Sequence, residues 1–149
     1  AKHDLALSYQ AFNTAYSDTG LFGVYAVSDH KYDLDDLVFE LQQEHVRIAL
    51  GATDEEVQRA RQHLKSVVLM GLDGTTAVAE DIGRQVLVYG RRHTWPELHA
   101  LIDAVDTATV RKVAQRYFYD TDPAVVALGP IGSVPDYNRI RAGTLWLRN

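Results

Sequence analysis

The residues best able to do chemistry in this chain are its six histidines: His3, His30, His45, His63, His93 and His99. No two of them are four positions apart, which is the spacing with which one helix presents a pair of zinc ligands. The stretch that ends in Glu44 and His45 follows the order of the inverted zinc motif His-x-x-Glu-His, but Leu41 stands where the first ligand belongs. His45 also lies on the apolar face of a predicted helix, which favours a packed histidine. We therefore predict no catalytic residue and no metal site in this chain.

Other patterns that could carry catalysis are weaker still. The small residues at 129–133 lack the Lys-Ser/Thr pair of a phosphate-binding loop. The chain has no cysteine and no Gly-x-Ser-x-Gly sequence, so neither thiol chemistry nor a serine nucleophile is supported. Asp33, Asp35 and Asp36 lie at the start of a predicted helix, whose positive end favours carboxylates. A solvated helix start is the favoured interpretation of this cluster, and a metal site is the alternative.

Composition restricts the partners. Fifteen lysines and arginines against twenty aspartates and glutamates give a net charge of -5, without the basic surplus that nucleic-acid binding uses. The longest apolar stretches, such as residues 66–72, fall short of the roughly 20 residues that cross a bilayer. A length of 149 residues fits one domain. We expect no nucleic acid and no membrane-spanning segment.

The elements that position these residues follow from periodicity and turn residues. Two runs with strand composition, residues 7–16 and 21–27, flank a Ser-Asp-Thr-Gly turn and predict a β-hairpin. Apolar residues at helical spacing predict helices that follow, two of them opened by the capping boxes Thr53/Glu56 and Thr94/Glu97. Their expected ranges are 34–51, 53–71, 75–90, 94–105, 106–117 and 135–141, and Thr75 or Thr76 is the expected cap of the third.

A third strand is expected at residues 124–128, a continuous apolar run between Pro123 and the Gly-Pro pair at 129–130. Strands and helices in separate runs predict an α+β fold. Three strands cover few helices, so we expect part of the sheet to be missing from this chain.

Six blocks of the sequence resemble one family, in conserved order and over essentially the whole chain. They are residues 12–23, 72–76, 80–85, 127–130, 135–141 and 145–148. These blocks are similar to the C-terminal part of mitochondrial processing peptidase β subunits and of the related core protein one of the respiratory cytochrome bc complex. Both groups belong to the pitrilysin- or insulinase-like metallopeptidases. The Leu-Asp-Gly-Thr sequence at residues 72–75 favours the β over the α type.

The resemblance implies that residues 1–149 form most of the second, non-catalytic domain of a subunit. Such a domain is a mostly antiparallel sheet backed by helices, and this chain would lack its first strands and helix, so that the domain is incomplete at its N-terminus. The first domain of the subunit carries His-x-x-Glu-His and zinc. The parent would remove presequences from imported mitochondrial precursors by metal-assisted peptide hydrolysis. The alternative role is a structural core subunit of respiratory complex III. Implied partners are the α subunit or the other core subunit, the N-terminal part of the same subunit, and presequence peptides. The implied location is the mitochondrial matrix, or the inner membrane within complex III.

The resemblance also implies substrate-binding residues. In distant insulinase-like members, a tyrosine on the first hairpin strand and an arginine several residues earlier reach substrate. Tyr9 matches the tyrosine, and Lys2 is the nearest match to the arginine. For Tyr9, packing on a sheet face is an equally good interpretation. For Arg84, in the block at residues 80–85, a structural ion pair or helix-end contact is favoured.

Overall fold

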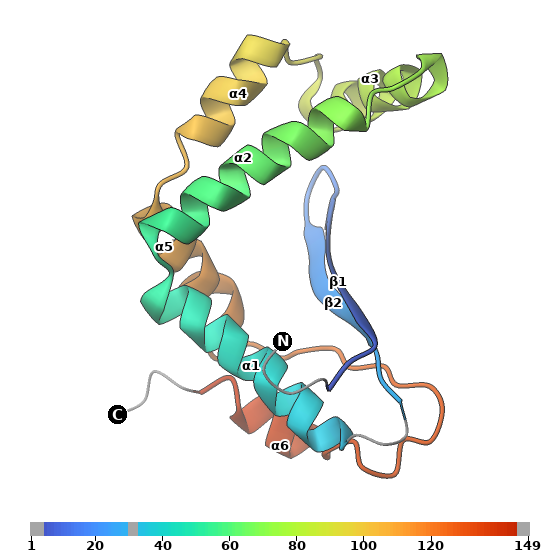
Figure 1. The fold of residues 1–149 in the computed structure, drawn as a ribbon, viewed down its shortest axis with the longest axis vertical. Helices are drawn as coiled ribbons and strands as arrows, with labels where there is room; N and C mark the ends of the chain where they lie inside the picture. The colour runs from blue at the N-terminus through green and yellow to red at the C-terminus, as the bar shows by residue number, and fades with distance from the viewer. Residues whose placement is uncertain (1–4, 30–32, 146–149) are drawn as a thin grey trace. The chain divides into compact units, whose positions relative to one another are not determined.

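The structure is a computed structural model that describes residues 5–29 and 33–145. Its described residues form a two-stranded sheet followed by helices, which confirms the predicted α+β class (Figure 1). In chain order the elements are β1 (Ser8–Ala15), β2 (Gly20–Val27), α1 (Leu34–Gly51), α2 (Asp54–Met70), α3 (Thr75–Tyr89), α4 (Trp95–Asp103), α5 (Thr107–Phe118) and α6 (Tyr137–Ala142). None of the helices in this described part is long and apolar enough to cross a membrane.

The chain divides into two compact units. The first comprises the described residues of 1–12, 23–52 and 110–149, and the second comprises residues 13–22 and 53–109. The first unit thus contains α1, most of α5, and α6, while the second contains α2, α3 and α4. The base of the hairpin belongs to the first unit and its tip to the second.

In the first unit, α1 and α6 lie side by side (Figure 1). The Gln42 side-chain amide donates to the Ile140 carbonyl at 2.6 Å, and Arg139 pairs with Asp35 at 2.8 Å. Ile140 is buried, as are the small residues Ala49 of α1 and Ala114 of α5. Small side chains let helix backbones approach closely, and Gln115 of α5 uses this proximity to donate to the Ala49 carbonyl at 3.2 Å.

A polar clip joins the end of α5 to the end of α6. The Arg141 guanidinium donates to Asp120 at 2.6 Å, to Thr144 at 2.8 Å, and also to Asp122. The Asp120 amide in turn donates to the Thr144 carbonyl at 3.0 Å. Asp120 has φ 52°, the left-handed conformation that aspartate tolerates better than most residues. The clip therefore fixes the point at which the chain leaves α5.

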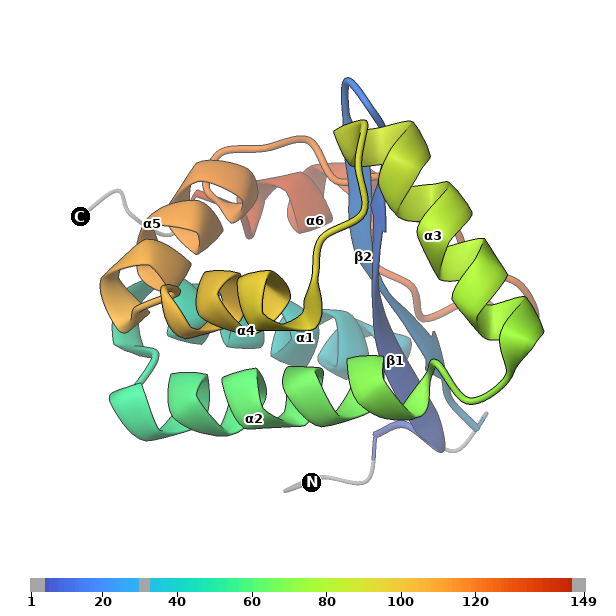
Figure 2. The same ribbon diagram turned by 90° about the horizontal axis from the view of Figure 1, so that it is seen from above.

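In the second unit, α4 lies along α2 (Figures 1 and 2). The Lys65 ammonium of α2 reaches the Asp103 carboxylate of α4 at 2.6 Å, and the Arg61 guanidinium donates to the Asp103 carbonyl at 2.9 Å. Val57 and Ile102 are the buried apolar residues among the described part of this unit. An ion pair and a hydrogen bond between α2 and α4 thus supplement a small apolar core in this unit.

The helix ends follow the predicted caps with one exception. Both capping boxes form: Glu56 accepts from the Thr53 amide at 3.0 Å, and Glu97 accepts from the Thr94 amide at 2.7 Å. The expected cap of α3 by a threonine is wrong, because Gly74 occupies that position with φ 103° and no side chain caps the helix.

The third strand expected at residues 124–128 is wrong. This segment forms no helix or strand, and its side chains are exposed, with Val126 at 96% and Leu128 at 101% relative exposure. A strand requires a neighbouring strand to accept its backbone hydrogen bonds, and no described segment pairs with this one. A prediction from apolar composition alone was therefore wrong about both the strand pairing and the burial of residues 124–128.

Candidate functional site: the exposed hairpin

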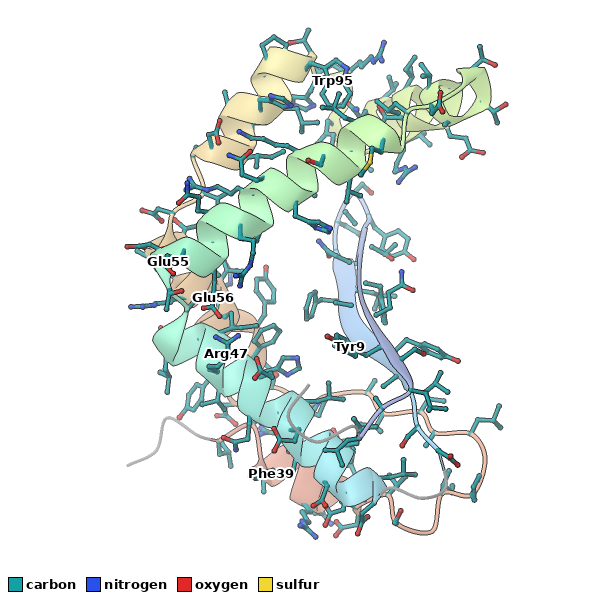
Figure 3. The ribbon with its side chains drawn as sticks, viewed as in Figure 1. Tyr9, Phe39, Arg47, Glu55, Glu56 and Trp95 are labelled. Carbon is teal, nitrogen blue, oxygen red and sulfur yellow. The ribbon has the colours of Figure 1, made fainter. Side chains whose placement is uncertain are left out.

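The candidate substrate-contact residue Tyr9 lies on β1 of the hairpin and is labelled in Figure 3. Its side chain is 73% exposed, so it does not pack on a covered sheet face among the described residues. Lys2, the second candidate, lies outside the described residues. The structure therefore leaves Tyr9 accessible and does not test whether it meets Lys2 or a substrate.

Local hydrogen bonds define the hairpin that carries Tyr9. At its base the Leu7 amide donates to the Val27 carbonyl at 2.8 Å, and the Ser28 hydroxyl donates to the Leu5 carbonyl at 2.8 Å. At its tip the Tyr16 amide donates to the Thr19 carbonyl at 2.9 Å and closes the turn. The sheet has only β1 and β2 within the described residues, so one backbone edge of each strand is unpaired there.

A close contact between Phe12 and Gly23 fixes the register of the two strands. The Phe12 ring lies over Gly23, where an added Cβ would stand 2.5 Å from the ring Cζ. An aromatic ring that covers a glycine on the neighbouring strand is a known stabilising pair in sheets. Because strand side chains alternate between faces, Tyr9 projects from the face opposite to Phe12.

Further exposed aromatic residues share the hairpin and were not singled out from the sequence. They are Tyr16 at the turn and Phe22 and Tyr25 on β2. A covered sheet face would show alternating burial, but every residue of β1 is exposed. The free backbone edges of the hairpin can bind an extended polypeptide as an added strand.

The described residues contain no group of three or more His, Cys, Asp or Glu side chains that could hold a metal ion. His45 instead stacks on the Phe118 ring, with ring centroids 4.4 Å apart and planes inclined by 21°. Burial lowers the pKa of His45 below its usual value, against a smaller opposite effect of the Glu44 charge. The interpretation of His45 as a packed residue is thus confirmed by its contact.

The acidic cluster at the start of α1 makes contacts that stabilise the helix. Asp33 caps α1 by accepting from the Asp35 amide at 3.0 Å, and Asp35 pairs with Arg139. For Arg84 of α3, the described residues provide no ion pair or helix-end hydrogen bond, and the side chain is exposed. The neighbouring Gln85 makes the structural contacts instead.

Comparison with known proteins adds the family. The family profile described as "Peptidase M16 inactive domain" matches residues 1–64. The chain is 53% identical over 149 residues to a probable mitochondrial-processing peptidase subunit beta of Arabidopsis thaliana, covering 99% of this chain and 28% of the relative. It is 48% identical over 148 residues to cytochrome b-c1 complex subunit 1 of Bos taurus, covering 99% of this chain and 31% of the relative. The profile thus assigns residues 1–64 to the M16 inactive domain, and the whole chain is similar to mitochondrial-processing peptidase β subunits and to cytochrome b-c1 complex subunit 1.

A solved structure agrees with this M16 assignment. A chain of complex III2 from Candida albicans, with Inz-5 bound, superposes with a TM-score of 0.89 at 30% identity, covering 96% of this chain and 34% of that chain. The present chain thus spans about a third of the proteins it matches. By their names the curated M16 relatives are mitochondrial, and the resemblance drawn from the sequence blocks is confirmed.

Proposed function

We propose that residues 1–149 are the C-terminal, non-catalytic domain of a mitochondrial processing peptidase β subunit, which helps to hold presequence peptides for cleavage. The similarity to processing peptidase β subunits over 99% of the chain carries this proposal, together with the match to the inactive domain. In the parent, zinc held by the first domain supplies the activated water. This chain contributes a binding surface, and its partners are that first domain, the α subunit and the peptide.

The described hairpin supports a role in peptide binding. A free strand edge can pair with the backbone of an extended peptide without reading its sequence, and adjacent side chains then add preference. Tyr9, exposed on β1, offers such a contact to one substrate side chain. Sequence-tolerant backbone pairing suits an enzyme that must accept many different presequences.

The experiment compares Tyr9→Ala, Tyr9→Phe and Tyr25→Ala in the assembled processing peptidase that contains this segment. Tyr25 is the matched control because it is a similarly exposed tyrosine on the other strand. We expect Tyr9→Ala to raise KM for a presequence peptide about fivefold while kcat changes less than twofold, since uniform binding is lost. Tyr9→Phe and Tyr25→Ala should stay close to the parent. Equal KM effects of both alanine variants would contradict a specific role of Tyr9.

The second candidate function is a structural core subunit of complex III, located at the inner membrane. The similarity to cytochrome b-c1 complex subunit 1 and to a chain of a solved complex III2 favours it. Immunoprecipitation of the native subunit from mitochondria separates the two roles. Presequence cleavage by the precipitate supports the peptidase, ubiquinol–cytochrome c reductase activity supports the core subunit, and both activities together would assign both roles to one polypeptide.

A further inference from the structure

The second unit contains a cavity of about 350 Å³ where the end of α2, the middle of α3 and the start of α4 meet. Trp95, labelled in Figure 3, lies at the first residue of α4 and lines this cavity. The volume is within the range of pockets that bind small organic groups. The cavity is separate from the hairpin and has no part in the proposed role of Tyr9.

Part of the cavity lining is apolar, and a ring contact holds its tryptophan in place. Leu72, which follows α2, and Leu98 of α4 line it together with Trp95. The Trp95 ring meets the His99 ring edge-on, at 5.8 Å between centroids and 75° between planes. An indole fixed by a neighbouring ring is a ready surface for stacking another aromatic ring.

The other side carries a short polar chain. The Gln85 side-chain amide donates to Asp81 Oδ2 at 2.8 Å, and its oxygen accepts from the His93 amide at 2.8 Å. The Gln85 side chain therefore uses both its donor and its acceptor, and its amide holds the Asp81 carboxylate in position. Asp81 and Arg92 also line the cavity, and the described residues supply no partner for the second Asp81 oxygen or for the Arg92 guanidinium. The cavity thus presents one free acceptor and one free donor beside an apolar wall.

We propose that this cavity binds the side chain of a tyrosine presented by a partner polypeptide. A phenol places its ring against Trp95 and Leu98, and its hydroxyl can both donate to Asp81 and accept from Arg92. A carboxylate would be repelled by Asp81 and an ammonium by Arg92, while an aliphatic or phenyl group would leave both polar groups unpaired. Tyrosine is also among the residues that most often anchor protein interfaces in such pockets.

The test uses the full chain with Trp146→Phe, which leaves Trp95 as the single tryptophan of the two in the sequence. The probes are the peptide acetyl-Ala-Tyr-Ala-amide, its Phe counterpart and free p-cresol, and the readout is the indole N–H resonance of Trp95. We expect the Tyr peptide to shift this resonance in a saturable way and to bind at least fivefold more tightly than the Phe peptide.

Variants then test the two polar groups. Asp81→Leu and Arg92→Met should each reduce the preference for Tyr over Phe to less than twofold. Arg84→Met, on the same helix as Asp81 but outside the cavity lining, should leave the preference unchanged. Arg92 is exposed and makes no described contact, so its variant remains informative even if Asp81→Leu disturbs the fold.

The alternatives give distinct results. Equal affinity for the Tyr and Phe peptides would show an apolar slot that does not read the hydroxyl, and would overturn the proposal. Binding of p-cresol without binding of the Tyr peptide would assign the cavity to a free small molecule and would also overturn it. No shift with any probe would mean that the cavity holds no phenol at all.

Discussion

At the scale of single residues, the Phe118 ring determines what His45 can do. An imidazole stacked on phenyl and half removed from water binds its proton less readily, which is why its pKa is lowered. The unfolded chain then binds more protons than the folded chain near pH 6. The contribution of His45 to stability is complete above its unfolded pKa of about 6.5 and is lost as pH falls through the lowered folded value.

We predict that His45→Leu costs less than about 1 kcal/mol and flattens the fall in stability between pH 7 and 5, because an apolar side chain suits the contact with Phe118. His45→Asp should cost about 1–3 kcal/mol more than the Leu variant, because a charge would meet an aromatic ring. Urea unfolding at pH 7 and pH 5 measures both effects. Equal stability of the Asp and Leu variants would show that position 45 faces water.

Glu97 gives a pH dependence of the same sign in a lower pH range. Hydrogen bonds lower the pKa of Glu97 to about 2. The largest effect comes from the Thr94 amide, followed by the Arg91 guanidinium and the Thr94 hydroxyl. Because the folded value lies below the unfolded one, the cap stabilises α4 above about pH 4.3 and is lost as pH falls toward 2. The Thr94 amide resonance should therefore titrate near pH 2, and Glu97→Gln should abolish that titration. A midpoint near pH 4 would mean that the cap does not form in solution.

At the scale of elements, the hairpin depends on one glycine. A side chain at Gly23 would collide with the Phe12 ring, so we predict that Gly23→Val destabilises by about 1–3 kcal/mol. Adding Phe12→Ala should recover part of this loss, since the obstructing ring is gone. Gly83→Ala is the control, because a Cβ there meets open space inside α3 and should stabilise by about 0.5–1 kcal/mol. Thermal unfolding of the three variants and of the parent chain measures these effects.

Helix starts and turns could be predicted from the sequence where contacts between neighbouring residues determine them. The capping boxes at Thr53 and Thr94 and the hairpin turn are short-range signals, and they formed as expected. Residues 124–128 failed because a strand is defined by a partner, which composition does not supply. For the site, Tyr9 was placed correctly on a strand, but its exposure depends on what covers the sheet. The cavity beside Trp95 was not foreseen, because its lining comes from three helices that periodicity does not position.

At the scale of the whole molecule, large apolar side chains are unusually exposed. No large side chain is fully buried among the described residues, and Leu87, Val126 and Leu128 are more than four-fifths exposed. Such surface, together with unpaired backbone on the hairpin and at 124–128, favours association. We predict that the isolated chain forms dimers or larger species at micromolar concentration, as sedimentation velocity would detect.

Paired variants identify the cause of that association. Val126→Lys should reduce it strongly, because a charge on an extended segment blocks strand pairing. Leu87→Lys changes an equally apolar but helical position, whose backbone is already paired, and should reduce association less. A monodisperse parent chain at high concentration would contradict the prediction.

The clip at Arg141 has a consequence for limited digestion. The run at 124–128 is exposed and lies outside every helix and strand, which makes it accessible to proteases, so a chymotrypsin-like enzyme should cut after Leu128 early in a time course. The C-terminal product would carry α6, yet it would not diffuse away at once. Buried Ile140, the bond from Gln42 and the Arg141 pair with Asp120 all join it to the part upstream of the cut. The nicked protein should elute as one species in native buffer and separate into two fragments only in denaturant.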